Sequence, residues 1–233
     1  MNKLISDCND FFKDCGFAYA ICGGFALELF LNKGLRPHSD MDVSIFDENR
    51  RDAAKFLLDA GWSIYKYFPK SLSLVPIFDP EDAADADFPC IWAMKPGSHV
   101  IAKPRKDEEN VFGFEFLNEV QQDFTYIEVI FNGRRGADFV CGRNENITRA
   151  IDKAILYKDD VPYLSPELIL FFKSPPVYST HEVHKDKTPV DFNAAAPFLP
   201  DESRQWLVKA LETAYSDGHD WIEKLKIKNH ANR

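Results

Sequence analysis

The spacing of apolar residues changes between helical and extended periods along the first sixty positions. Apolar residues recur at steps of three and four in some segments, which is typical of a helix with one buried face. Short runs of β-branched and aromatic residues separate these segments and predict strands. The pattern predicts helix, strand, helix, strand and helix, in that order, over residues 2–15, 17–22, 25–33, 41–46 and 47–61. Glycines 16, 34 and 61 are the expected helix stops.

Strand-like runs continue through the middle of the chain, and helices dominate after Pro162. Strands are expected over residues 62–68, 71–78, 112–120, 124–132 and 138–143, with a turn at 133–136. The acidic segment 79–90 is expected to be a solvated loop. Helices are expected over 165–174, with Ser165 as N-cap and Pro166 at the first position, and over 203–215 and 220–228. These elements predict an α+β fold. A mixed β-sheet domain flanked by helices would occupy residues 1–145, and a mainly helical lobe would occupy 146–233.

Composition narrows the functional class. The formal net charge of −9 argues against non-specific binding of nucleic acid, which needs a basic surface. The five cysteines show no CxxC spacing, which fits thiols in a reducing compartment. No apolar run approaches the ~20 residues of a membrane span, and the N-terminus does not resemble a signal peptide. A cytoplasmic protein is therefore expected, with no membrane partner. Nothing in the sequence indicates the oligomeric state.

Asp40 and Asp42 have the spacing of side chains that share one face of a strand. Met41, Val43 and Ile45 would pack into the core on the other face. Two carboxylates this close repel each other unless a positive charge lies between them. Mg²⁺ is commonly bound by one or two carboxylates together with substrate phosphates, so the pair predicts a magnesium site. Aspartates in a solvated turn are the plainer alternative.

Glu128 interrupts a run of aromatic and β-branched residues, where an unpaired charge is costly to bury. A neighbouring strand carrying Glu128 would supply a third carboxylate, acting as metal ligand, as general base, or as both. Glu115 is a rival for this position. A solvent-facing edge strand is the structural alternative for Glu128.

Gly23 and Gly24 lie at a predicted strand-to-helix junction, where the backbone can approach a ligand and helix N–H groups can face an anion. A nucleoside triphosphate would then lie between these groups and the metal. Arg36 could bind phosphate oxygens or pair with a nearby acid. For His38, orienting an aspartate is favoured over a metal role.

Lysines 173, 185 and 187 could also reach a triphosphate, although a surface role is commoner for lysine. His181 and His184 have no evident third partner, so no zinc site is expected.

One stretch, Gly23 to Phe46, resembles the signature of the DNA polymerase β-type nucleotidyltransferase superfamily. It is most similar to the aminoglycoside 2″-adenylyltransferase and lincosamide nucleotidyltransferase group. The shared arrangement is Gly23-Gly24, a helix, and then Arg36, His38, Asp40 and Asp42 before a strand. Residues 127–148 and the helical half show a weaker likeness. The superfamily's third acid is usually aspartate, and Glu128 stands at the matching position.

The resemblance implies a Mg²⁺-dependent enzyme that moves a nucleoside monophosphate, AMP from ATP, to a hydroxyl of a small molecule. It further implies an acceptor like an aminoglycoside or a lincosamide. Two alternatives stay open: a nucleotidyltransferase that modifies a protein or transfer RNA, and a catalytically silent binding protein of the same fold.

Overall fold

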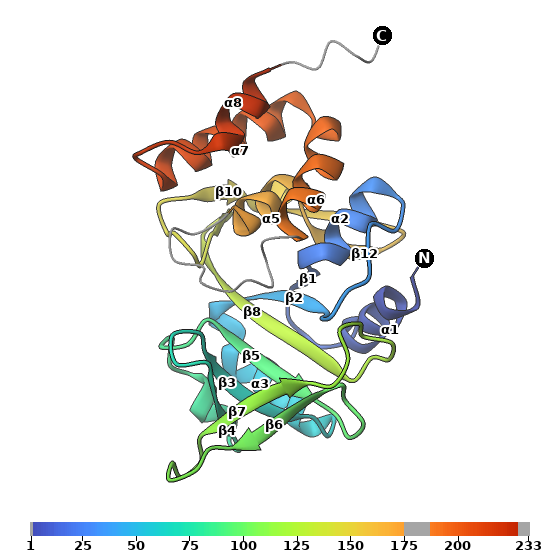
Figure 1. The fold of residues 1–233 in the computed structure, drawn as a ribbon, viewed down its shortest axis with the longest axis vertical. Helices are drawn as coiled ribbons and strands as arrows, with labels where there is room; N and C mark the ends of the chain where they lie inside the picture. The colour runs from blue at the N-terminus through green and yellow to red at the C-terminus, as the bar shows by residue number, and fades with distance from the viewer. Residues whose placement is uncertain (1, 175–186, 228–233) are drawn as a thin grey trace.

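The computed structural model describes residues 2–174 and 187–227 (Figure 1). Its centre is a mixed β-sheet with the strand order β11-β12-β1-β2-β8-β5-β3-β4-β7-β6, and β9 and β10 extend from one end of β8. Pairing is parallel between β1 and β12 and between β2 and β8, and antiparallel elsewhere. The predicted α+β class is confirmed.

The strands up to the middle of the chain are β1 (Tyr19–Ile21), β2 (Asp42–Phe46), β3 (Ser63–Phe68), β4 (Ser73–Ile77), β5 (Cys90–Met94), β6 (Val100–Pro104) and β7 (Phe112–Phe116). The later strands are β8 (Tyr126–Arg135), β9 (Asp138–Val140), β10 (Thr148–Ala150), β11 (Ile155–Lys158) and β12 (Val161–Leu164). The helices are α1 (Lys3–Phe12), α2 (Gly23–Leu31), α3 (Arg50–Asp59), α4 (Ile151–Ala154), α5 (Pro166–Lys173), α6 (Lys187–Ala195), α7 (Asp201–Ala214) and α8 (Asp220–Lys226).

Figure 1 shows how the layers are arranged. The strands β3 to β7 gather at one end of the molecule and α7 and α8 at the other, with the long strand β8 running between them. A large apolar core joins α1, α2, α3 and α5 to the sheet. A smaller core lies between the other sheet face and the β6–β7 hairpin, and consists of Leu74, Cys90, Trp92, Met94, Val100 and Tyr126.

Several element boundaries differ from those that the sequence predicts. Helix α2 begins at Gly23 and ends before Asn32, whose left-handed backbone (φ 55°) forms the C-cap in place of Gly34. The acidic segment 79–90 is not simply a solvated loop. It contains a short 3₁₀ helix, Pro80–Ala83, and the Arg50 side chain donates to the carbonyl oxygens of Asp85 (3.3 Å) and Phe88 (3.1 Å). Arg50 therefore fixes this segment to α3.

The strands β5, β6, β11 and β12 were not predicted. Strand β5 is buried along its whole length, so it lacks the alternation that marks a half-exposed strand. Strand β12 pairs in parallel with β1, so the sheet extends past residue 145 into the stretch assigned to the helical lobe. Within residues 2–174 and 187–227, no helix has the length and apolar character needed to cross a membrane.

Candidate functional site

Asp42 and Glu128 are direct neighbours in the sheet. Strands β2 and β8 run parallel, and Asp42 is the register partner of Glu128. Asp40 lies two residues before Asp42, in the segment that leads into β2. The intervening Met41 is fully buried, as are Val43 and Ile45 beyond it, and these residues form the face predicted to pack into the core. Ser44, on the same face as the acids, is buried as well. The fold therefore brings the three predicted carboxylates to one place.

Electrostatics show how costly this arrangement is. Burial, together with the nearby Asp40 charge, raises the pKa of Asp42 to about 7. Burial also raises the pKa of Glu128 well above its ordinary value, and the charges of Asp42 and Asp40 add to this effect. The Tyr126 hydroxyl donates to Glu128 Oε1 at 2.6 Å and orients that carboxyl group. A cation bound here would relieve the repulsion.

Glu115 lies elsewhere. It is on β7, which β5, β3 and β4 separate from β8 in the sheet order, and its half-exposed side chain pairs with Lys103. The structure thus brings Glu128, and not Glu115, beside Asp42.

The two glycines make room for site side chains. Gly23 has a φ of +62°, and a Cβ atom there would lie 1.8 Å from Asp42 Oδ2. A Cβ atom at Gly24 would lie 2.2 Å from His38 Cε1. The Cys22 amide donates to the Asp42 carbonyl oxygen at 2.9 Å. Glycine is therefore needed at the start of α2 because the Asp42 and His38 side chains occupy the space that a Cβ atom would take.

His38 is buried, and its ring contacts Glu28 and Arg36. Its Nε2 lies 2.9 Å from Glu28 Oε1, and its Nδ1 lies 3.3 Å from Arg36 Nη1. Burial lowers the pKa of His38, and the Arg36 charge adds to this although Glu28 opposes it. A neutral imidazole that donates from Nε2 to Glu28 and accepts at Nδ1 from Arg36 satisfies both contacts.

Asp191 on α6 was not predicted as a site residue. Its fully buried carboxylate accepts two hydrogen bonds from Arg36, at 3.0 and 2.9 Å, and pairs with Lys173 on α5 at 2.9 Å. The structure thus shows Arg36 paired with an acid, the second of its two predicted alternatives. The signal in the sequence was a charged residue between Val190 and Phe192, in a stretch that resembles the family's helical half.

Three cations lie on the helical side of the carboxylates. The charges of Lys173, Arg36 and Lys187 all act to lower the pKa of Asp42, against the larger effects of burial and Asp40. Lys187 Nζ also donates to Ser39 Oγ at 3.2 Å. Lys185, His181 and His184 lie outside the described residues.

The donor set fits a hard divalent cation. Within residues 2–174 and 187–227, no three His, Cys, Asp or Glu side chains form a ready-made metal cage. Mg²⁺ does not need such a cage, because one or two carboxylates and substrate phosphates commonly complete its octahedron. The oxygen donors of Asp40, Asp42 and Glu128 are of the kind that Mg²⁺ prefers, and a bound cation would favour their charged forms.

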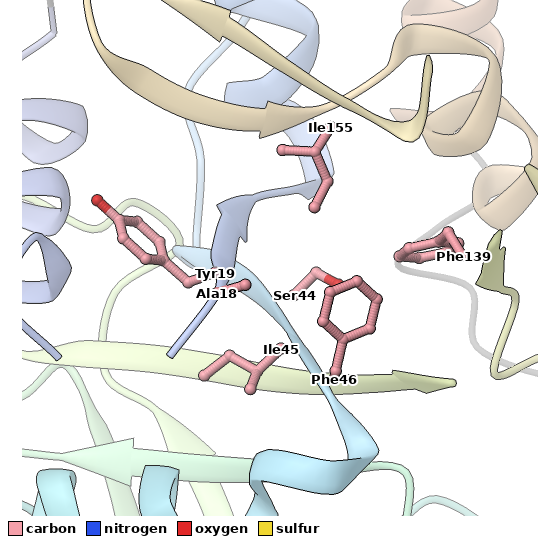
Figure 2. Close-up of a pocket in the computed structure, with 7 residues that line it drawn as sticks. All are labelled: Ala18, Tyr19, Ser44, Ile45, Phe46, Phe139 and Ile155. Carbon is pink, nitrogen blue, oxygen red and sulfur yellow. The ribbon is translucent and has the colours of Figure 1, made fainter. Parts of the chain in front are cut away.

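A separate narrow recess lies near β1 and β2 (Figure 2), and it leaves no room for a water molecule. Its lining is mainly apolar: Ala18, Tyr19, Ser44, Ile45, Phe46, Phe139 and Ile155. It contains no carboxylate and no basic side chain. The carboxylate cluster is therefore the better candidate site, although it is not a deep cavity.

Comparison with solved structures identifies the fold. The solution structure of the antibiotic-resistance factor ANT(2″)-Ia is 12% identical and matches 91% of each chain with a TM-score of 0.50. The lincomycin-bound lincosamide antibiotic adenylyltransferase LnuA is 12% identical, with a TM-score of 0.47 over 83% of this chain and 98% of that one. A nucleotidyltransferase-like protein from Paracoccidioides brasiliensis is 16% identical, with a TM-score of 0.46 over 97% and 91% of the two chains. No protein-family model and no curated protein sequence matches the chain. The predicted resemblance is confirmed at the level of the fold, which is that of ANT(2″)-Ia.

Proposed function

We propose that this protein is a Mg²⁺-dependent nucleotidyltransferase that moves a nucleoside monophosphate, AMP from ATP, onto a hydroxyl group of a small molecule. The observation that carries the proposal is the register of Asp42 and Glu128, which places two repelling, half-buried carboxylates side by side with Asp40 two residues away. A purely structural role would not account for this cost. The fold shared with ANT(2″)-Ia agrees with the proposal.

Asp40 and Asp42 would hold the cation, and Glu128 would complete the site as ligand, as general base, or as both. Bound Mg²⁺ supplies neutralising charge to the phosphates. Burial raises the pKa of Glu128, which makes its carboxylate a stronger proton acceptor than an ordinary glutamate, and Tyr126 holds it in place.

In the reaction, the acceptor oxygen forms a bond to the α-phosphorus as the bond to the bridging oxygen breaks. Pyrophosphate leaves with the bonding electron pair, and the hydroxyl proton passes to Glu128. The first turn of α2 at Gly23 and Gly24 would approach the triphosphate. Arg36, Lys173 and Lys187 would attract its charge from the other side, with Arg36 and Lys173 held by Asp191.

The resemblance extends the proposal to an acceptor like an aminoglycoside or a lincosamide. ATP as the donor fits the cytoplasmic location expected from the cysteines.

Calorimetric titration of a non-hydrolysable ATP analogue, with and without Mg²⁺, tests the proposal. We expect Mg²⁺-dependent binding to the wild type, weakened at least tenfold in Asp42→Asn. Asp59→Asn is the matched control, because Asp59 is exposed and pairs with Lys55 on the surface of α3. Failure of ATP, GTP, CTP and UTP analogues to bind the folded protein at any Mg²⁺ concentration would favour a catalytically silent fold instead.

A further inference from the structure

An aromatic surface adjoins Glu128 on the face of the sheet that carries the acids. Trp92 on β5 is the register partner of Glu128, on the side opposite Asp42. The Phe114 ring lies 4.6 Å from that of Trp92, and the Phe116 ring lies 6.1 Å from Trp92 and 6.2 Å from Tyr126, measured between centroids. We call Trp92, Phe114, Phe116 and Tyr126, with Leu117 and Val120 at the edge, the aromatic surface.

The edge of this surface is exposed although it is apolar. Phe116 is 40% exposed, Leu117 54% and Val120 38%. Most apolar side chains of this size in the described residues are buried, and exposed apolar clusters often mark binding sites.

Backbone hydrogen bonds fix this edge next to the acids. The Leu117 amide donates to the His99 carbonyl oxygen, and the Gln121 amide donates to the His38 carbonyl oxygen, both at 2.7 Å. His99 Nε2 in turn lies 2.8 Å from the Ser39 carbonyl oxygen. The segment 117–121 is thus attached to the residues directly before Asp40.

The base of the surface interacts with Glu128. The buried indole N–H of Trp92 acts on the Glu128 carboxyl group as a hydrogen-bond donor, which favours its charged form. The side-chain oxygen of Gln121 is buried, and no partner for it lies within the described residues.

Basic side chains lie on one side of the acids, and the aromatic surface lies on the other. Arg36, Lys173 and Lys187 come from the segment before β2 and from α5 and α6, on the helical side of the acids. The aromatic surface lies on the β6–β7 side and carries no cation. A triphosphate would be drawn toward the cations, which leaves the aromatic side for the acceptor, with Glu128 between the two.

We infer that the aromatic surface binds the acceptor through an aromatic or apolar ring. The acceptor would then be a hydroxylated compound with such a ring near the reacting hydroxyl, and not a polycationic sugar. The inference rests on the proposed function and narrows its substrate class. The exposed part of the surface, Phe116, Leu117 and Val120, is apolar, which suits an apolar ring.

Two glucosides that differ only in the aglycone test this inference. Phenyl β-D-glucopyranoside and methyl β-D-glucopyranoside have the same sugar hydroxyls. Each is titrated into the protein with and without Mg²⁺ and the ATP analogue, and tobramycin serves as the polycationic probe. We expect the phenyl glucoside to bind the wild type at least tenfold more tightly than the methyl glucoside does. Transfer of labelled AMP should show the same preference.

Substitutions locate the effect. Phe116→Ala and Leu117→Ala should each reduce the preference for the phenyl glucoside while nucleotide binding is retained. Phe78→Ala is the matched control, because Phe78 is 77% exposed and lies outside the aromatic surface. Equal affinity for the two glucosides, a preference that survives Phe116→Ala, or tighter binding of tobramycin would overturn the inference. Absence of nucleotide binding would instead count against the proposed function, and the glucosides without nucleotide still test the surface.

Discussion

Gly23 combines two constraints that can be separated experimentally. Its φ of +62° disfavours any side chain, and a Cβ atom would also collide with Asp42 Oδ2. Gly61 has a similar φ of +76° but nothing within 4 Å of its Cβ position. We expect Gly23→Ala and Gly61→Ala to lose about 1–2 kcal/mol of stability each through backbone strain. Only Gly23→Ala should also weaken Mg²⁺-dependent binding of the ATP analogue, at least tenfold, by displacing the Asp42 carboxylate. Equal binding by the two variants, measured calorimetrically, would contradict this role.

Glu128 should destabilise the metal-free protein. Glu128→Gln removes a buried charge beside Asp42 and keeps an oxygen that can accept from Tyr126. We expect the variant to be more stable than the wild type at pH 8 without Mg²⁺, because burial and the charges of Asp42 and Asp40 raise the pKa of Glu128 and so disfavour its charged form. Thermal unfolding should record a Tm higher by about 2–4 °C per kcal/mol. Glu115→Gln, the control, loses only an exposed ion pair and should change the Tm by little. A lower Tm for Glu128→Gln than for the wild type would contradict the expectation that the Glu128 charge destabilises the metal-free protein.

Asp40, Asp42 and Glu128 could be predicted from the sequence because each stands out in the local pattern of its own strand. Strand alternation alone puts Asp40 and Asp42 on one face, and Glu128 stands out in an apolar run. Asp191 gave no comparable signal. It lies 155 residues beyond Arg36, and only the packing of α6 against α2 brings the two together.

Helices α5 and α6 are joined to the segment before β2 through Asp191. The carboxylate is fully buried and serves both Arg36 and Lys173. Asp191→Asn would leave two cations largely buried without their acid, so we expect a loss on the order of 3–5 kcal/mol in urea unfolding. Glu212→Gln is the control, because its half-exposed pair with Lys226 should contribute less than about 1 kcal/mol. Equal losses of stability in the two variants would contradict the view that Asp191 holds Arg36 and Lys173 in place.

The contribution of the Asp191 carboxylate to stability should depend on pH. Burial by itself would raise the pKa of Asp191, but hydrogen bonds from Arg36 and Lys173 and their charges outweigh it and lower the pKa. A group with a lowered native pKa stabilises the fold fully above its unfolded pKa, about 3.9, and loses this contribution as the pH falls through the native value. The difference in unfolding free energy between wild type and Asp191→Asn should therefore be constant from pH 5 to 7 and shrink below about pH 4. A difference that grows on acidification would contradict the sign.

Most helices and the strands rich in β-prone residues could be predicted from the sequence. Strands β5, β6, β10, β11 and β12 and helices α4 and α6 were not predicted. Strands β3, β4, β7 and β8 alternate or carry β-prone residues and were found. Strand β5 offers no alternation, and Pro162 in β12 suggested the start of the helical region. Proline is tolerated there because the register pair of β12 with β1 is at Tyr163, whereas Pro162 lies opposite Tyr157 of β11.

The sequence predicts a domain boundary near residue 145, but contacts join the two sides of this boundary. Many contacts cross that boundary. Among them, β12 pairs with β1, the Arg143 side chain donates to the carbonyl oxygens of Phe171 and Ser174, and the apolar face of α5 lies in the main core. Leu168, Ile169, Leu170 and Phe171 are fully buried there.

We therefore expect the full chain to unfold in one cooperative calorimetric transition. A fragment of residues 1–145 should show no cooperative transition, because it exposes the core surface that α5 covers and leaves one edge of β1 unpaired. It should also fail to bind the ATP analogue, since Lys173, Lys187 and Asp191 are absent from it. Far-UV circular dichroism during heating distinguishes the outcomes. A sharp transition of the fragment by itself would mean that the boundary near residue 145 is a true domain boundary despite the shared sheet.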